Sequence, residues 1–231
     1  MQINPLGQPV GHAVPGWSPR QPPTARELAG RYCRLERLDP ERHAEALFAA
    51  DRHDVRGESW TYLPYGPFTE LGAYREWVRE AGRGADPRFY AIIDLDTGTG
   101  SAAGVASYLR IQPDAGSIEV GHVHFSPLLQ RRRAATEAQF VLMRHAFEDL
   151  GYRRYEWKCD ALNEPSRRAA ARLGFTYEGR FRNHVVYKSR SRDSDWFSIT
   201  DAEWPALAPV FEKWLDPANF VDGVQQSPLR F

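Results

Sequence analysis

Alternation of large apolar and charged side chains predicts a first strand over residues 30–38. Two helices are expected after it. One opens at Asp39-Pro40 and runs to about Ala50, and the other is capped by Thr69 and runs to about Gly82. The side-chain oxygens of Asp39 and Thr69 are suited to bond the free N–H groups of a first helical turn. The pattern therefore opens as strand, helix, helix.

Three strands separated by turns are predicted next, at 88–94, 102–111 and 117–125. β-branched and aromatic residues dominate these runs, whereas Gly, Pro, Asp and Thr dominate the turns at 96–100 and 113–116. Short turns of this kind join antiparallel neighbours. We therefore expect the three strands to lie side by side in a sheet.

Apolar residues then recur at spacings of three and four, which predicts a helix from about Ala134 to Leu150 with Gly151 as its C-cap. A strand at 152–160 follows, and a strand–helix–strand unit favours parallel pairing through a right-handed crossover. The remaining pattern predicts a short helix at 163–173, strands at 175–186 and 196–200, and a C-terminal helix and tail.

Composition and charge narrow the class of protein. The 30 basic residues balance the 30 acidic ones, which argues against a dedicated nucleic-acid binder, although residues 126–192 are rich in Arg. Cys33 and Cys159 are too few for a disulfide scaffold and are expected to stay reduced. No apolar run approaches the roughly 20 residues of a membrane span. The N-terminus also lacks the apolar core of a signal peptide. We expect a cytoplasmic protein without a membrane partner.

The ends of the chain differ from its middle. Residues 1–29 contain a run of Pro and Gly, which indicates an extended arm, and Trp17 is expected to pin that arm to the body. We interpret it as a surface arm, and an arm that wraps a dimer partner or edges a site is the alternative. Residues 30–200 are expected to form one domain, on which a helix and tail at 201–231 pack.

Residues 117–151 combine a strand, a turn and a helix N-terminus. Such a turn offers free N–H groups and the positive end of the helix dipole to an anion. Arg131, Arg132 and Arg133 stand at this point of the chain. We interpret the stretch as a pyrophosphate site.

Several motifs sharpen this interpretation. Gln130-Arg-Arg-Arg-Ala-Ala135, followed by Thr136-Glu-Ala138, resembles the Gln/Arg-x-x-Gly-x-Gly/Ala loop of the GCN5-related N-acetyltransferase (GNAT) superfamily. Asn163-x-x-Ser166, Arg172-Leu-Gly-Phe175 and Glu178-Gly179 match its ribosomal-protein N-acetyltransferase (RimJ/RimL-like) subgroup in order and spacing. The resemblance covers about residues 30–200. It implies an α+β GNAT fold, with a central mixed, mostly antiparallel twisted β-sheet flanked by helices in the order β-α-α-β-β-β-α-β-α-β-β.

The resemblance implies an N-acetyltransferase that moves acetyl from acetyl-CoA, its donor substrate, to a primary amine by direct attack in a ternary complex, without a metal. Main-chain groups on the strand would hold the pantetheine arm, and the loop would hold the phosphates. The implied cofactor-binding residues are Val123, Phe125, Gln130, Arg131, Arg132, Arg133, Ala134, Ala135, Thr136, Asn163, Ser166 and Arg168. Arg133 replaces the first Gly of the family's loop, so it must keep ordinary helical dihedrals to present its N–H.

Glu119, Ser166 and His124 are the candidate catalytic residues. Related enzymes often place a Glu on this strand as the base, acting directly or through water, and His122 and His124 compete with it. Alternation along the strand puts Glu119 on one face and both histidines on the other, unless a bulge intervenes. Two histidines without a third ligand do not make a zinc site.

The resemblance also suggests how the leaving thiolate is handled. Many relatives use a Tyr as the acid, but Ala170 occupies its position here. Ser166 is expected to bond the CoA sulfur and Asn163 the pantetheine amide. Helix capping is the alternative for both.

The resemblance implies an acceptor site built from the aromatic loop, with Glu58, Trp60, Tyr62 and Tyr65, and from the late hairpin, Asn183 to Trp196. Glu58 and Asp195 are expected to attract a cationic amine. A loop that only packs on the core is the alternative. The sequence leaves open whether the acceptor is a small amine or a protein N-terminus, and whether the chain forms a homodimer. It also leaves open a catalytically weak acyl-CoA-binding regulatory or scaffold protein on the same fold.

Overall fold

An eight-stranded mixed sheet forms the centre of the computed structural model, which describes residues 2–231. Its strand order is β3-β4-β5-β6-β7-β8-β10-β9, and every neighbouring pair is antiparallel except β7 and β8. The strands are β3 (Glu27–Ala29), β4 (Cys33–Arg37), β5 (Arg88–Asp94), β6 (Ser101–Gln112), β7 (Ser117–Phe125), β8 (Arg154–Asp160), β9 (Thr176–Tyr187) and β10 (Arg190–Thr200). The expected α+β class with a mixed, mostly antiparallel sheet is confirmed.

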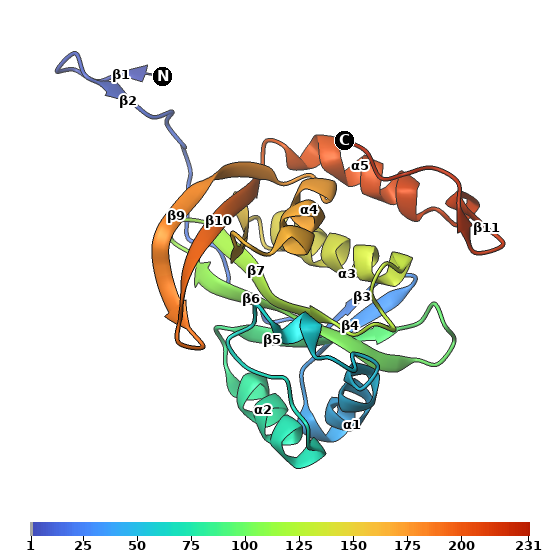
Figure 1. Cartoon of the computed structure of the whole chain (residues 1–231). Helices are drawn as coiled ribbons and strands as arrows, with labels where there is room; N and C mark the ends of the chain where they lie inside the picture. Colours follow the sequence, from blue (N-terminus) through green and yellow to red (C-terminus); the bar gives the residue numbers. More distant parts are fainter. Residues whose placement is uncertain (1) are drawn as a thin grey trace.

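Helices cover both faces of the sheet (Figure 1). Helices α1 (Pro40–Asp51) and α2 (Leu71–Arg83) lie on one face, and α3 (Arg133–Arg144), α4 (Glu164–Arg172) and α5 (Trp204–Leu215) lie on the other. Short helical turns are η1 (Glu58–Trp60), the π-helical η2 (His145–Asp149) that extends α3, and η3 (Pro217–Asn219). Each face buries its own apolar cluster, one around Trp60 and Tyr74 and the other around Tyr108 and Phe211.

Most predicted elements are present, with differences at their ends. Asp39 and Asn163 cap α1 and α4 as expected, but Glu70 rather than Thr69 occupies the N-cap of α2 and makes no side-chain cap bond. The strand expected at 196–200 begins earlier, since β10 pairs with β9 from Arg190 onward. Strand β3 was not predicted, because three residues carry too short a pattern.

The N-terminal arm carries a small hairpin of β1 (Gln2–Ile3) and β2 (Pro9–Val10) that lies away from the sheet (Figure 1). Trp17 pins the arm as predicted: its Nε1 donates to the Asp114 carbonyl at 2.9 Å, and its ring packs beside Gly116. At the other end, a pair of two-residue strands, β11 (Phe220–Val221) and β12 (Val224–Gln225), follows α5. No helix within residues 2–231 is long and apolar enough to span a membrane. Cys33 and Cys159 are buried and free.

Candidate functional site

The ladder between parallel strands β7 and β8 stops halfway. It joins Ser117–Val120 to Arg154–Trp157, yet β7 continues to Phe125 and β8 to Asp160. Because each buried backbone group needs a partner, the unpaired halves of two strands form a slot that an extended ligand can fill.

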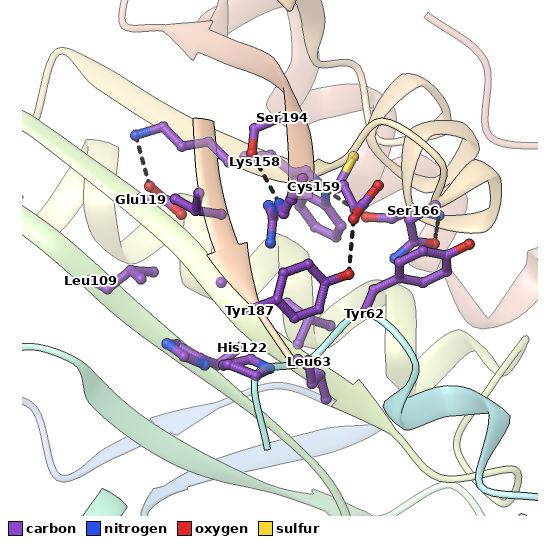
Figure 2. A pocket seen from close by; sticks show the side chains of 18 of the residues that line it. Tyr62, Leu63, Leu109, Glu119, His122, Lys158, Cys159, Ser166, Tyr187 and Ser194 are labelled. Atoms are coloured by element: carbon purple, nitrogen blue, oxygen red, sulfur yellow. Dashed lines mark hydrogen bonds and ion pairs between the residues drawn. The ribbon is translucent and has the colours of Figure 1, made fainter. Parts of the chain in front are cut away.

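A cavity of about 340 Å³ lies at this slot. Strands β7 and β8, the start of α4, the loop after η1 and the β9–β10 hairpin all contribute to its wall. Figure 2 shows Glu119 and Lys158 toward one side of it, Tyr62 and Ser166 toward the other, and Tyr187 between them. Two side chains link neighbouring segments of this region by hydrogen bonds to main-chain carbonyls. Tyr62 Oη donates to the Leu162 carbonyl at 3.0 Å, and Lys188 Nζ donates to the Trp60 carbonyl at 2.9 Å.

A bulge in β7 changes which side chains face the cavity. The register against β6 shifts by one residue between Gly121 and His124, and His122 has a φ of +50°. Val123 and Phe125 consequently pack toward the α3 side, whereas His122 and His124 pack against the cluster that contains Trp60. Glu119 was expected opposite the histidines unless a bulge intervened, and the bulge is present, so this arrangement does not hold here.

The two histidines have different surroundings. His124 is 3% exposed, stacks on Trp60 with ring centroids 3.8 Å apart, and does not line the cavity. Its Nε2 lies 2.9 Å from Ser59 Oγ, so its surroundings in this structure are those of a packed side chain away from the cavity. His122 lines the cavity with its Nδ1 3.0 Å from Tyr65 Oη. Burial, followed by repulsion from Arg110, lowers the pKa of His122 to about 4.

Glu119 lines the cavity between two cations. Arg110 Nη1 lies 2.8 Å from both carboxylate oxygens, and Lys158 Nζ lies 2.9 Å from Oε2. Burial raises the pKa of Glu119 above its ordinary value, although Lys158 and Arg110 oppose the shift. The carboxylate is thus a stronger base than an exposed Glu, and it is fixed in position.

In the loop before α3, several side chains are bonded to other parts of the protein, and none caps the N–H groups of the helix. Gln130 Nε2 donates to the Phe125 carbonyl at 2.8 Å, and the N-cap residue Arg132 gives the helix no side-chain cap. Arg133 has an ordinary helical backbone as predicted, and its guanidinium binds Asp96 and lies over the Tyr32 ring. The left-handed residue is Arg131, with a φ of +62°. Arg131 and Arg132 are exposed, so their side chains are free to approach phosphates.

The next three loop residues are buried at the start of α3. Ala134 and Ala135 can contribute only main-chain N–H groups to an anion. The Thr136 hydroxyl accepts from Arg172 Nη1 at 3.1 Å.

Asn163 and Ser166 both line the cavity. Asn163 Oδ1 accepts from the Ser166 N–H at 3.1 Å, which is the expected cap. Ser166 Oγ accepts from Trp157 Nε1 at 3.0 Å. Burial raises the pKa of Cys159 to about 11, so this thiol stays protonated. Arg168 is 72% exposed near Glu164 and does not line the cavity.

Of the four residues expected to bind the acceptor, only Tyr62 lines the cavity. Trp60 is 3% exposed in the core, and Glu58 pairs with Arg56 on the surface. Tyr65 is hydrogen-bonded to His122, which lines the cavity, but does not line the cavity itself. Asp195 is fully buried and neutralised by Arg167 and Arg180, so it does not attract an amine from solvent.

Lys158 and Asp160 line the cavity although the sequence analysis did not name them, whereas Tyr187 and Arg192 belong to the hairpin at 183–196 that was expected to face the acceptor. Tyr187 Oη donates to Asp160 Oδ2 at 2.8 Å, and burial raises the pKa of Tyr187 to about 12. Lys158 and Asp160 have the sequence context of ordinary strand residues, so only the pairing of β8 in the folded sheet identifies them. No cluster of three His, Cys, Asp or Glu side chains suited to a metal occurs within the described chain.

Comparisons with known proteins agree with this geometry. The family model for the acetyltransferase (GNAT) domain matches residues 33–176. A GCN5-related N-acetyltransferase from Brucella melitensis is 44% identical with a TM-score of 0.90, over 94% of this chain and 97% of that one. A probable GNAT acetyltransferase from Chromobacterium violaceum is 39% identical with a TM-score of 0.78, over 86% and 98%. The putative ribosomal N-acetyltransferase YdaF of Bacillus subtilis is 26% identical over 174 residues, which are 74% of this chain and 90% of that protein. This chain belongs to the GNAT acetyltransferase family.

Proposed function

We propose that this chain transfers the acetyl group of acetyl-CoA to a primary amine by direct attack in a ternary complex. The observation that carries the proposal is the slot where β7 and β8 stop pairing, with a charged cavity on it and the uncapped N-terminus of α3 after β7. Family membership supports acetyl-CoA as the donor, and it favours an acetyltransferase over a weakly catalytic regulator or scaffold.

The donor would lie along β7. An extended pantetheine arm can bond to the main chain of Val123 and to the N–H of Phe125, which lie beyond the end of the β7–β8 ladder, while the Phe125 carbonyl accepts from Gln130. The N–H groups of residues 131–136 would bind the diphosphate at the positive end of α3, and the exposed Arg131 and Arg132 would bind the remaining phosphate.

The reaction needs a group that accepts the proton of the amine and a group that stabilises the departing CoA thiolate. The amine nitrogen attacks the thioester carbon, the carbon–sulfur bond breaks, and the proton lost by the amine passes to Glu119 directly or through water. A main-chain N–H of β7 would polarise the thioester carbonyl. The Ser166 hydroxyl would donate a hydrogen bond to the departing sulfur.

A small amine fits the site better than a protein N-terminus, because the hairpin and the loop at 62–64 enclose a cavity of only about 340 Å³. A RimJ/RimL-like acceptor is the second candidate, supported by the relative named as a putative ribosomal N-acetyltransferase.

Two measurements test the proposal. Calorimetry with acetyl-CoA should show one site per chain, and a thiol-release assay with acetyl-CoA and a panel of small amines should show turnover. Binding without turnover on amines, peptides or ribosomal proteins would favour the regulator instead. Absence of acetyl-CoA binding would refute the proposal altogether.

A further inference from the structure

The hairpin side of the cavity carries a cation without a counter-ion. Arg192 lines the cavity and is half-buried. Its Nε donates to Ser194 Oγ at 2.9 Å, and its guanidinium lies 5.8 Å from the centre of the Tyr187 ring. Across residues 2–231, no carboxylate forms an ion pair with it, although its terminal nitrogens would suit one.

The other Lys and Arg side chains of the cavity are already paired with carboxylates. Arg110 and Lys158 share Glu119, and Lys158 also pairs with Glu156 at 2.8 Å. Asp160 accepts hydrogen bonds from Tyr187 Oη and from the Leu162 N–H, both at 2.8 Å. Among the Lys and Arg side chains that line the cavity within residues 2–231, Arg192 is therefore the one without a carboxylate partner.

The surroundings of Arg192 favour an anion over a second cation. His184 lines the same wall, and burial followed by repulsion from Arg192, Arg110 and Lys158 lowers its pKa. Arg192, Arg110 and Lys158 thus lie near enough to His184 to disfavour a positive charge there, in addition to the effect of burial. Leu63, Pro64 and Val185 add apolar surface beside it, which suits the body of a small organic molecule.

The donor does not account for this charge. The phosphate loop at 130–136 contributes no residue to the cavity wall, so the diphosphate would be bound elsewhere on the same ligand. An anionic group beside Arg192 would thus belong to the acceptor.

We propose that Arg192 binds an anionic group of the acceptor, so that the substrates are small primary amines that also carry a carboxylate or a phosphate. This inference rests on the proposed function, because it assigns the second substrate of the same site. A planar guanidinium binds either anion through two parallel hydrogen bonds. A polyamine or an aminoglycoside would instead place a second ammonium against Arg192 and be repelled.

Matched amine pairs test the proposal. L-leucine is compared with L-leucinamide, and O-phosphoethanolamine with ethanolamine, in the thiol-release assay at equal concentrations of unprotonated amine. Binding of the same four compounds to the enzyme–CoA complex is measured by calorimetry, independently of turnover. Arg192→Gln is the test variant, and Arg190→Gln, an exposed Arg on the same strand outside the cavity, is the control.

We expect at least one acidic amine to exceed its neutral partner by about tenfold or more in kcat/KM and in affinity. Arg192→Gln should remove that preference through KM, while acetyl-CoA binding and the Arg190→Gln variant stay unchanged. A preference within the leucine pair would indicate carboxylate recognition, and a preference within the ethanolamine pair would indicate phosphate recognition.

Two outcomes would overturn the inference: a preference for the neutral amines, or a preference for the acidic amines that survives Arg192→Gln. Turnover of the neutral amines alone would leave the acetyltransferase standing and reject the anion site. Acidic amines that bind through Arg192 without turnover would support the anion site and count against the proposed function. If none of the four compounds binds or reacts, the inference is wrong for acceptors of this size.

Discussion

At the residue scale, the site is governed by which polar groups are already occupied. Glu119 is held by Arg110 and Lys158, His124 by Ser59 and Trp60, and Asp195 by two arginines. Residue type alone made all three acidic or basic groups candidates. Their partners leave Glu119 as the one of these three that lines the cavity.

Replacing Glu119 should remove the base. In Glu119→Gln we expect kcat to fall by about 100-fold or more, because an amide cannot accept the proton of the amine. The wild-type rate should fall as pH decreases through the raised pKa of Glu119, and this acid limb should vanish in the variant. A pH–rate profile of both proteins provides the measurement.

Glu156→Gln is the matched control, since Glu156 shares Lys158 with Glu119 but does not line the cavity. An equal loss of rate in both variants would mean that the ion-pair network, and not the base, had been damaged. Thermal unfolding of each variant checks that the fold is intact.

Ser166 is expected to assist departure of the CoA thiolate. In Ser166→Ala, kcat should fall by about 10- to 100-fold, while the KM for acetyl-CoA changes by less than about twofold. Trp157→Phe removes the indole donor to Ser166 but keeps the hydroxyl, so it should leave the rate near wild type. A rate in Ser166→Ala equal to wild type would exclude Ser166 from the mechanism.

At the element scale, helix α3 is positioned by a buried carboxylate. Glu137 on α3 accepts hydrogen bonds from the N–H groups of Arg31, Tyr32 and Cys33 at 2.9, 2.6 and 2.8 Å. Gly30 lies close to the same carboxylate, with no room for a Cβ. This contact fixes α3, and with it the phosphate loop, to the start of β4.

Glu137→Gln should therefore destabilise the protein by about 3 kcal/mol, because the amide nitrogen cannot accept and leaves buried N–H groups without a partner. Urea unfolding followed by fluorescence measures the change. Glu148→Gln, farther along the same helical stretch, is the control, since it affects one hydrogen bond from the Trp204 indole at an exposed position. A loss below about 1 kcal/mol in Glu137→Gln would contradict this role.

At the scale of the whole molecule, the arm divides at Trp17. The β1–β2 hairpin is held by its own Asn4 side chain, whereas Trp17 contacts Asp114 and Gly116 and lies under Arg20. The body of the protein therefore depends on the second half of the arm and not on the first.

Removal of residues 2–11 should change the free energy of unfolding by less than about 0.5 kcal/mol, because the hairpin adds little to the core. Trp17→Ala should cost about 1–2 kcal/mol through lost apolar contact and stacking. Chemical denaturation of the two variants compares them. A large loss from the truncation would show that the hairpin packs on the protein or on a second copy.

The sequence determined the element order, most caps and the family, because these depend on local spacing. Period-3.6 and period-2 patterns mark the helices and strands, and the residues within each motif, Gln130–Ala135 and Asn163–Ser166, are near neighbours in the chain. Such features can be recognised from the linear sequence alone. Local patterns did not predict the three-residue strand β3, and they placed the N-cap of α2 one residue too early.

Only the tertiary structure decided which side chains meet at the cavity. One extra residue in β7 places His122 and His124 on the opposite face from the one that regular alternation predicts. A bulge leaves no periodic pattern in the sequence from which it could be predicted. Lys158 and Arg192 reach the cavity because β8, β10 and the hairpin bring them beside β7. Contacts between residues this far apart in the chain depend on strand pairing and burial, which the sequence pattern of each strand alone does not specify.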